Sequence, residues 1–327
     1  MDTTISTPAG PRTGKVFKKT VGRYWVKSGG DAVICTASSK LRKVLVYPEA
    51  DASSRRPTVD RVVDVQTVDP VAVGDEVTYK RSDDGTGVIT EVLPRRNKLS
   101  RKAAGTQPLE QVIIANLDQM VAVVAAAQPP PKWKLLDRYL ADAEFLEVPA
   151  LICITKMDLV DEGEFAEDVN VYREVGYSAV LTSAVTGLGM DELKSALEDR
   201  VSVFLGKSGV GKTTLLNRIQ PDLGLAVQEV SGKTGKGKHT TSHLEMFELG
   251  FGGSVADTPG IREFGLWQTE DIDITWLFRE MRPYIGSCKF GASCTHSHEP
   301  GCAVKAAVEA GEITKRRYDN LLRLQRN

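Results

Sequence analysis

The stretch GKSGVGKTTLLN, residues 206–217, is the motif that decides the predicted fold of the central part of this chain. It follows the apolar run VSVFL and precedes a segment of helical periodicity, so it predicts a turn between a strand and a helix. Its residues match the pattern G-x-x-x-x-G-K-[ST], in which backbone N–H groups and a helix N-terminus surround phosphate oxygens. This context favours a phosphate-binding loop over a purely structural glycine turn.

The residue types of this loop suit contact with a nucleotide. Glycines let the backbone bend so that its N–H groups point toward phosphate oxygens. We expect Lys212 to reach the β- and γ-phosphates of a nucleoside triphosphate, and the Thr213 hydroxyl to ligate Mg²⁺. The predicted phosphate-contacting residues are Gly206, Lys207, Ser208, Gly209, Val210, Gly211, Lys212, Thr213 and Thr214.

The tetrapeptide DTPG, residues 257–260, closes the apolar run SVADT downstream of the loop. An aspartate at a strand end, here Asp257, can hold Mg²⁺ through water, and the backbone N–H of Gly260 can contact the γ-phosphate. DTPG alone is a common turn. Its order and distance after the phosphate loop favour the functional interpretation.

Residues 231–247 form a Gly- and Lys-rich stretch that is too polar for a core. Such a loop can order around the γ-phosphate and Mg²⁺, so we predict a switch segment with Thr240 or Thr241 as the metal ligand. Many GTPases carry a water-orienting glutamine after the DxxG motif, but Ile261 stands there in this chain. His239 is the candidate catalytic residue in its place, because imidazole can accept or donate a hydrogen bond near neutral pH. The alternative is a solvent-exposed loop histidine.

The stretch ITKMDL, residues 154–159, predicts selection of the base. The carboxylate of Asp158 can accept two hydrogen bonds from guanine that adenine cannot offer, and the Lys156 stem can lie along the base. TSA, residues 182–184, ends the next predicted strand and can offer a backbone N–H to the guanine oxygen. At Thr155 GTPases generally carry asparagine, so one hydrogen bond to the base or the loop is expected to be weaker. The predicted base-contacting residues are Thr155, Lys156, Asp158, Ser183 and Ala184.

The order of these motifs is unusual for a GTPase. Apolar runs such as QVIIANL, QMVAVVAAA, ALICITK and VSVFLG alternate with helical patterns, which predicts a parallel α/β sheet with its ligand beyond the carboxyl ends of the strands. The base-selecting motifs precede the phosphate loop, whereas such motifs normally follow it. We therefore predict a circularly permuted GTPase domain, a rearrangement tolerated because chain termini lie close together at the surface. The switch then leads into the C-terminal region, which nucleotide state could move.

The C-terminal stretch CKFGASCTHSHEPGC predicts a zinc site. Its three cysteines and first histidine form a set of ligands suited to tetrahedral Zn²⁺, with His298 as the alternative nitrogen ligand and redox-active thiols as the competing interpretation. Residues 273–285 and 303–325 are predicted to be helices that pack around the metal. The predicted zinc ligands are Cys288, Cys294, His296 and Cys302.

The N-terminal region reads as a small β-barrel. Short β-branched segments separated by GG, VGD and DDGTG fit an OB-fold, a common oligonucleotide-binding barrel. Tyr24 and Trp25, beside Arg23 and Lys27, could stack on bases or could belong to the core, and both alternatives stay open. Residues 47–70 are predicted to be an extended loop in this barrel, with or without RNA contact.

Basic residues are concentrated in the N-terminal region although the net charge of the chain is −1. Residues 1–43 contain nine Lys or Arg against two Asp, and a second basic stretch, RRNKLSRK, covers residues 95–102. This distribution fits a partner with a phosphate backbone, and a solvated basic face is the alternative.

Length and composition set the domain organisation. A chain of 327 residues with 41% hydrophobic residues can bury two or three cores. The sequence has no apolar run of membrane-spanning length and no secretory signal, so we expect a cytoplasmic monomer with no membrane partner. The predicted domains are a flexible tail at 1–14, an OB-fold RNA-binding domain at 15–102, a circularly permuted GTPase domain at 103–272 and a zinc-binding helical domain at 273–327.

Taken together, GRYWV, VGD, LPRRNKLSR, ANLDQ, TKMDL, GKSGVGKTTLLN, GKGKHTT, DTPGIREFGL and CTHSHEPGCAVKAAVEAGEI resemble the ribosome small subunit-dependent GTPase A family (RsgA, also called YjeQ). The resemblance spans nearly the whole chain after the tail. It implies an enzyme that binds GTP, GDP, Mg²⁺ and one structural Zn²⁺, and that hydrolyses GTP when stimulated by the small (30S) ribosomal subunit during its late maturation. It also implies an rRNA partner, and it supports His239 as catalytic and the Cys₃His set as zinc ligands.

Two other functions remain open at this stage. The first is an RNA-binding module whose nucleotide site acts as a sensor with negligible turnover, which Ile261 motivates. The second is a P-loop ATPase or kinase, against which Asp158 argues because its carboxylate favours guanine. DNA is not an expected partner.

Overall fold

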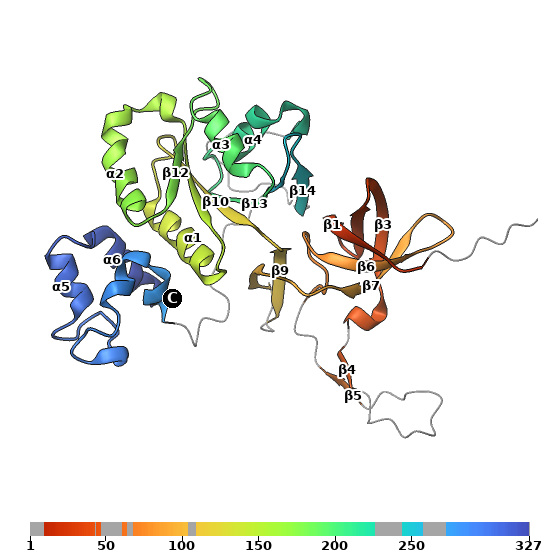
Figure 1. Cartoon of the computed structure of the whole chain (residues 1–327), viewed down its shortest axis with the longest axis horizontal. Coiled ribbons are helices and arrows are strands. Elements are labelled where there is room, and N and C mark those ends of the chain that lie inside the picture. Colours follow the sequence, from red (N-terminus) through yellow and green to blue (C-terminus); the bar gives the residue numbers. More distant parts are fainter. Residues whose placement is uncertain are drawn as a thin grey trace, which may run out of the picture. The chain divides into compact units, whose positions relative to one another are not determined.

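The computed structural model describes residues 10–42, 44–46, 61–63, 68–103, 109–225, 244–257 and 273–326. These residues form two compact units. The first runs to Leu117 and includes most of strand β14 (Leu244–Glu248), and the second contains most of the described residues from Asp118 onward. Figure 1 labels many of the helices and strands of both units.

The first unit contains a closed five-stranded barrel. Its strands are β1 (Arg12–Thr20), β2 (Arg23–Ser28), β3 (Asp31–Ala37), β6 (Glu76–Arg81) and β7 (Gly87–Val92). They pair in the order β1-β2-β3-β7-β6, and β6 pairs back onto β1, which closes the barrel. The predicted OB-like barrel is confirmed. Its core consists of Val16, Tyr24, Val26, Val33, Cys35, Val71, Val77, Tyr79 and Ile89.

The alternation of side chains along β2 separates its two aromatic residues. Tyr24 points into the core, is 1% exposed, and donates a hydrogen bond from its hydroxyl to Asp69 at 2.7 Å. Trp25 is half-buried on the opposite face of the strand. Of the two alternatives for these residues, Tyr24 is a core residue, and only Trp25 is placed where a base could reach it.

Two short antiparallel ribbons accompany the barrel. Strand β4 (Val44–Val46) pairs with β5 (Arg61–Val63), so the predicted loop at 47–70 contains a strand, and residues 47–60 and 64–67 lie outside the described part. Strand β8 (Lys98–Lys102) pairs with β9 (Glu110–Ala115).

The assignment of QVIIANL to the parallel sheet is wrong, because this segment is β9 and its partner is β8. Ile114 bridges to Val73, and Asn116 donates to the carbonyl of Gly74, which attaches β9 to the first unit. An apolar run by itself does not show which sheet it joins. The predicted domain boundary after residue 102 falls inside this β8–β9 ribbon.

The second unit is built on a parallel sheet in the order β12-β11-β10-β13-β15. The chain runs from β10 out to β12 and then returns to β13 on the other side of β10, so the strand order reverses between β10 and β13. In open α/β sheets this reversal marks the ligand crevice. The strands are β10 (Gln119–Ala125), β11 (Ala150–Thr155), β12 (Ser178–Leu181), β13 (Val201–Leu205) and β15 (Ser254–Asp257), and the helices are α1 (Trp133–Phe145), α2 (Glu162–Glu174), α3 (Met190–Leu197) and α4 (Lys212–Ile219).

The C-terminal region contains helices α5 (Ala303–Glu309) and α6 (Lys315–Leu324), which are interrupted at Gly311 with φ +79°. The predicted helix over 273–285 is instead two 3₁₀ turns, η4 (Ile274–Leu277) and η5 (Arg279–Tyr284). Pro283 lacks a backbone N–H and cannot continue an α-helix there. A third turn, η6 (Gly291–Ser293), lies within the cysteine-rich stretch.

A buried ionic cluster, here called the Arg317 cluster, joins α6 to α1 within the second unit. Arg317 is 1% exposed and donates to Asp137 on α1 at 2.8 Å and to Glu280 on η5 at 2.6 Å. Tyr172 donates to Asp137 at 2.8 Å, and Asn320 donates to the same carboxylate. Paired charges of this kind fix one docking arrangement, because any other leaves a buried charge without its partner.

In the described parts of the chain, no helix combines the length and the apolar character needed to cross a membrane.

Candidate nucleotide site and metal centre

The phosphate loop connects β13 to α4 at the point where the strand order of the sheet reverses. A side chain at Gly206 would place its Cβ 2.7 Å from the carbonyl oxygen of Val123, so this position admits only glycine without a backbone shift. Gly211 precedes α4 with φ +95°, a conformation that favours glycine. The predicted loop therefore occupies the predicted strand-to-helix turn. Ser208 and Thr214 are exposed, and Thr213 is half-buried in the first turn of α4.

Lys212 lies across its own loop. Its ammonium donates to the carbonyl oxygen of Gly206 at 2.7 Å and to that of Lys207 at 3.5 Å. These carbonyls are weaker partners for an ammonium than phosphate oxygens, because a charged acceptor makes the stronger hydrogen bond. The lysine is thus held close to the loop and can exchange its partners for a phosphate.

The two predicted base-recognition motifs meet beyond the ends of β11 and β12. The hydroxyl of buried Ser183 donates to the exposed carboxylate of Asp158 at 2.5 Å, and the Thr186 N–H donates to the Ser183 oxygen at 3.1 Å. The Met157 N–H donates to the carbonyl of Thr182 at 3.2 Å. These contacts orient the Asp158 carboxylate, and Ala184 follows directly as a half-buried residue.

The base motif is also tied to the phosphate loop. Lys156 adopts φ +61°, and its ammonium donates to the carbonyl of Gly209 at 2.8 Å and to that of Gln128. The Thr155 hydroxyl donates to the carbonyl of Val210. Thr155 therefore does bond to the loop, although asparagine generally occupies this position in GTPases. The segment predicted to select the base and the predicted phosphate loop are therefore in direct contact.

The predicted switch residues His239, Thr240, Thr241 and Gly260 lie outside the described residues, as does Ile261. The backbone of Asp257 is described and ends β15, where it pairs with Phe204 of β13. Asp257 therefore stands at a carboxyl strand end next to the strand that leads into the phosphate loop.

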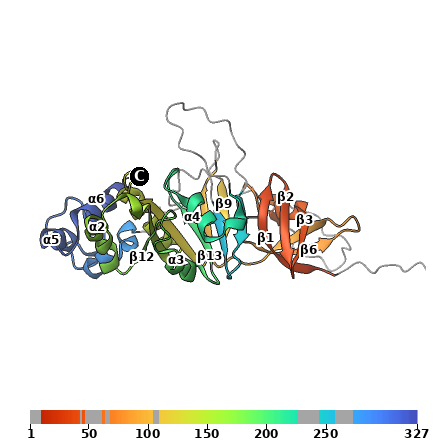
Figure 2. The same ribbon diagram turned by 90° about the horizontal axis from the view of Figure 1, so that it is seen from above.

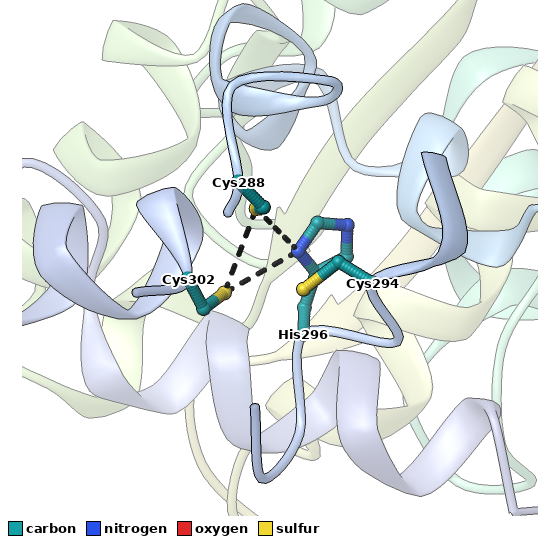
Figure 3. Close-up of side chains that lie close together, drawn as sticks. All are labelled: Cys288, Cys294, His296 and Cys302. Carbon is teal, nitrogen blue, oxygen red and sulfur yellow. Dashed lines mark hydrogen bonds between the residues drawn. The ribbon is translucent and has the colours of Figure 1, made fainter. Parts of the chain in front are cut away.

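The four predicted zinc ligands converge in the C-terminal region. Their ligand atoms all lie within 4.8 Å of one another, and all four residues are buried. Figure 3 shows the four side chains pointing toward one another. The Cys288 and Cys302 sulfurs are 3.9 Å apart, and Nδ1 of His296 is 3.5 Å from Cys288 Sγ and 3.4 Å from Cys302 Sγ. The ligand set comes from loop residues and from Cys302, the N-cap of α5.

These distances fit a tetrahedral zinc ion. Zn–S bonds of about 2.3 Å and a Zn–N bond of about 2.05 Å place two sulfurs about 3.8 Å apart, and sulfur and nitrogen about 3.5 Å apart. His296, rather than His298, lies in the cluster with the three cysteines, and the Nδ1 of exposed His298 contacts the Ser297 hydroxyl instead. A zinc ion bound here would close the C-terminal loops on themselves.

Backbone N–H groups donate hydrogen bonds to two of the cysteine sulfurs. At Cys288, burial opposes ionisation, but the Ala303 N–H donates to the sulfur at 3.2 Å, and the pKa of this thiol lies below its usual value. Burial raises the pKa of Cys294 to about 12. The Lys305 N–H donates to the Cys302 sulfur at 3.5 Å. Metal binding must therefore displace protons from at least one thiol of this set.

Glu299 organises the loop that carries Cys294 and His296, and it is not among the residues predicted from the sequence. Its carboxylate accepts from the Thr295 hydroxyl at 2.6 Å and from the backbone N–H groups of Thr295, Ser297 and His298 at 2.8, 3.0 and 3.1 Å. The hydroxyl bond and these backbone bonds lower its pKa to about 2. The T-x-S-x-E spacing, with two hydroxyl residues before a glutamate, was the available signal.

Basic residues of the stretch 95–102 form ion pairs within the first unit. Arg95 forms a bidentate pair with fully buried Asp75, with both N–O distances at 2.7 Å. Lys98 pairs with Glu110 at 2.7 Å. These two cations hold the β8–β9 ribbon and the adjoining loop in place, so they are poor candidates for contacts with phosphates.

Comparison with known proteins agrees with this architecture. The model of the RsgA GTPase family matches residues 92–267. A protein of Chlorobaculum tepidum named small ribosomal subunit biogenesis GTPase RsgA is 45% identical over 78% of this chain and 84% of its own length. A protein of the same name from Actinobacillus pleuropneumoniae is 38% identical over 84% of this chain and 81% of its own length.

Solved structures agree as well. YjeQ from Thermotoga maritima superposes with a TM-score of 0.69 at 31% identity, covering 96% of this chain and 97% of its own. YloQ, described as a circularly permuted GTPase, superposes with a TM-score of 0.64 at 31% identity, covering 97% and 95%. With the base-selecting strands placed before the phosphate loop, and with the match covering most of its length, this chain belongs to the RsgA GTPase family.

Proposed function

We propose that this protein is a GTP hydrolase that acts on the small ribosomal subunit during its biogenesis. The observation that carries the nucleotide part is the contact of the two motifs in one site, where Lys156 bonds to Gly209 of the phosphate loop and Ser183 holds Asp158. The ribosomal part is supported by relatives that are 38–45% identical and are named small ribosomal subunit biogenesis GTPases.

The chain's own residues account for binding of GTP and Mg²⁺. When GTP and Mg²⁺ bind, Lys212 would exchange its loop carbonyls for the β- and γ-phosphates, and Thr213 and Asp257 would hold the metal ion, which would neutralise charge on the phosphates. Asp158 accepts from the base, and Ser183 keeps its carboxylate oriented. Guanine is thereby preferred over adenine, which has no matching pair of donors.

Hydrolysis requires a group that positions water at the γ-phosphate. His239 has this role in our proposal; Thr240 or Thr241 would also hold Mg²⁺, and Gly260 would contact the γ-phosphate. The argument for His239 is chemical: Ile261 at the usual glutamine position can neither donate nor accept a hydrogen bond.

The barrel and the C-terminal region have the remaining two roles in this proposal, which are RNA binding and structural metal binding. The barrel of the first unit supplies an rRNA-binding surface, and the Cys₃His set holds one structural Zn²⁺ whose role is to close the C-terminal region. We expect the protein to act as a monomer in the cytoplasm, where ribosomal subunits are assembled. The domains at 15–102, 103–272 and 273–327 are the proposed functional division.

Phosphate release by the purified chain, with and without small ribosomal subunits, tests this function. The wild type, His239→Ala and His243→Ala are compared; His243 is the matched control because it belongs to the same segment. Strong stimulation by the subunit in the wild type and in His243→Ala, lost in His239→Ala with GTP binding retained, supports the proposal. Stimulation that survives His239→Ala removes that residue from the chemistry, and a silent wild type saturated with subunits leaves only the sensor function.

A further inference from the structure

The hydroxyl of Thr155 is bonded to the phosphate loop. Thr155 is the last residue of β11, is 4% exposed, and pairs with Ala125 of β10. Its hydroxyl donates to the carbonyl oxygen of Val210 in the phosphate loop, and the carbonyl oxygen of Val124 on β10 is a second acceptor at 3.5 Å. Figure 2 shows β13 and α4, the two elements that this loop connects. Both partners of the Thr155 hydroxyl are therefore acceptors.

The number of hydrogens at position 155 limits what this side chain can contact. A hydroxyl group has one hydrogen to donate, and at Thr155 two buried carbonyl oxygens accept it. An asparagine side chain, which GTPases generally carry at this position, has two N–H groups. One N–H can donate to the loop carbonyl while the other donates to a ligand. Threonine can make the first of these bonds but not the second.

The atom of the base that lacks a donor follows from the edge of guanine. The polar groups of this edge stand in the order N2–H, N1–H, O6 and N7, and the last two are acceptors. In the proposed function the carboxylate of Asp158 accepts from the first two, and a backbone N–H of residues 182–184 donates to O6. A side-chain donor at position 155, on the loop side of the motif, would serve N7. The ammonium of Lys156 does not replace it, because it donates to the carbonyl of Gly209 at 2.8 Å.

We propose that this protein makes no hydrogen bond to N7 of guanine, and that it therefore binds 7-deazaguanine nucleotides as tightly as guanine nucleotides. This inference rests on the proposed function, since it concerns the base site of the same GTPase. Selection of guanine then comes from Asp158 and from the contact at O6. Thr155 is a positioning residue, which holds the base-selecting segment on the phosphate loop through the Val210 carbonyl.

The test compares nucleoside diphosphates, which are not hydrolysed, in competition against fluorescently labelled GDP on the full chain with Mg²⁺. 7-Deaza-GDP has a C–H group in place of N7 and keeps N1, N2 and O6. We expect the wild type to bind GDP and 7-deaza-GDP with affinities within about twofold of each other. Thr155→Asn supplies the second donor, so we expect it to prefer GDP by about three- to tenfold, the effect of one neutral hydrogen bond.

Two further variants separate contact with the base from support of the loop. Thr155→Ser keeps the hydroxyl and is the matched control, so the affinity ratio of the two nucleotides should stay near that of the wild type. Thr155→Val removes the hydroxyl at nearly constant volume. Both nucleotides should then lose affinity by the same factor, because the loop loses its bond while N7 had none. Thermal unfolding of each variant verifies that the sheet is intact.

The inference is overturned if the wild type binds GDP about tenfold or more tightly than 7-deaza-GDP. It is also overturned if Thr155→Val changes the ratio of the two affinities, or if Thr155→Asn gains no preference for GDP. Failure of the proposed function is a separate result. Equal affinities for GDP and ADP, or for GDP and inosine diphosphate, would show that Asp158 does not select guanine, whatever the result with 7-deaza-GDP.

Discussion

The metal centre and the nucleotide site of the second unit use their polar groups in opposite ways. In the metal centre four ligand atoms lie within 4.8 Å, and backbone N–H groups already support the sulfurs. In the nucleotide site Lys212 bonds to the carbonyls of its own loop, and Asp158 keeps an exposed carboxylate. In the metal centre the fold already holds the ligand atoms close enough to bind one small ion. In the nucleotide site Lys212 and Asp158 make hydrogen bonds that a reversibly bound nucleotide can replace.

The largest expected effect is at the metal centre. Cys302→Ser removes a ligand and also changes the N-cap of α5, so we expect loss of stoichiometric zinc and unfolding of the C-terminal region. Structural zinc contributes an apparent free energy of about 10–16 kcal/mol in small zinc peptides, which sets the scale. Metal analysis and thermal unfolding measure the effect. Cys153→Ala, a buried cysteine outside the cluster, should keep its zinc; retained zinc in Cys302→Ser would contradict the assigned ligand set.

The residues of the metal centre and those of the phosphate loop are about equally easy to predict from the sequence. Both come from closely spaced residues, so the phosphate loop and the Cys₃His set could be identified from spacing alone. Contacts between distant residues could not. Arg317 is separated from Asp137 by 180 residues, and in a polar helix such an arginine looks solvated. Arg95 likewise looked available for RNA, although Asp75, 20 residues away, binds it.

The Arg317 cluster tests whether the C-terminal region is a fixed part of the second unit. Arg317→Met leaves Asp137 and Glu280 as buried carboxylates without their cation, and we expect a loss of about 3–5 kcal/mol in the free energy of unfolding. Urea denaturation measures it. Lys315→Met, at an exposed position of the same helix, should stay within about 0.5 kcal/mol. Equal stability of the two variants would mean that the cluster does not hold α6 on α1.

Asp142, on the same helix as Asp137, is a buried carboxylate whose Oδ2 atom has no hydrogen-bond partner among the described residues. Burial raises its pKa to about 7 from 3.8. Because the folded-state pKa is the higher one, protonation favours the folded state, and stability is lost as pH rises from about 4 to about 7. Asp142→Asn removes this cost, so we expect it to stabilise the protein at pH 8 by up to about 4 kcal/mol.

Urea denaturation of both proteins between pH 5 and pH 8 checks the Asp142 prediction. Both carry the same metal centre, so the difference between them isolates Asp142. The stability difference should grow with pH and level off above about 7. A difference that does not vary with pH would show that Asp142 is ordinarily ionised in the folded state.

The next prediction concerns whether the exposed carboxylate of Asp158 binds the guanine base. Asp158→Asn loses an acceptor for the guanine N–H groups, and we expect about a 100-fold weaker affinity for GTP, about 2.7 kcal/mol. The new amide can donate to the 2-oxo group of xanthine, so xanthosine triphosphate should bind better than it does to the wild type. Competition against labelled GDP measures both affinities. Asp161→Asn, at the N-cap of α2, is the matched control; equal losses in the two variants would remove Asp158 from base recognition.

The smallest expected effect is at Glu299, which lies beside the predicted zinc ligands but is not one of them. Its carboxylate accepts four hydrogen bonds from the loop that carries Cys294 and His296. Glu299→Gln replaces one acceptor oxygen by a donor NH₂ group that faces backbone N–H groups, so the loop loses part of its support while all four ligands remain. We expect zinc to leave up to about tenfold faster, measured with a metallochromic chelator.

Glu309→Gln, exposed on α5, is the matched control for Glu299→Gln and should release zinc at the wild-type rate. If the two variants release zinc equally fast, the metal alone holds the ligands in position. The metal centre would then be no better arranged by the chain than the nucleotide site. A faster release confined to Glu299→Gln means that the chain itself arranges the metal ligands.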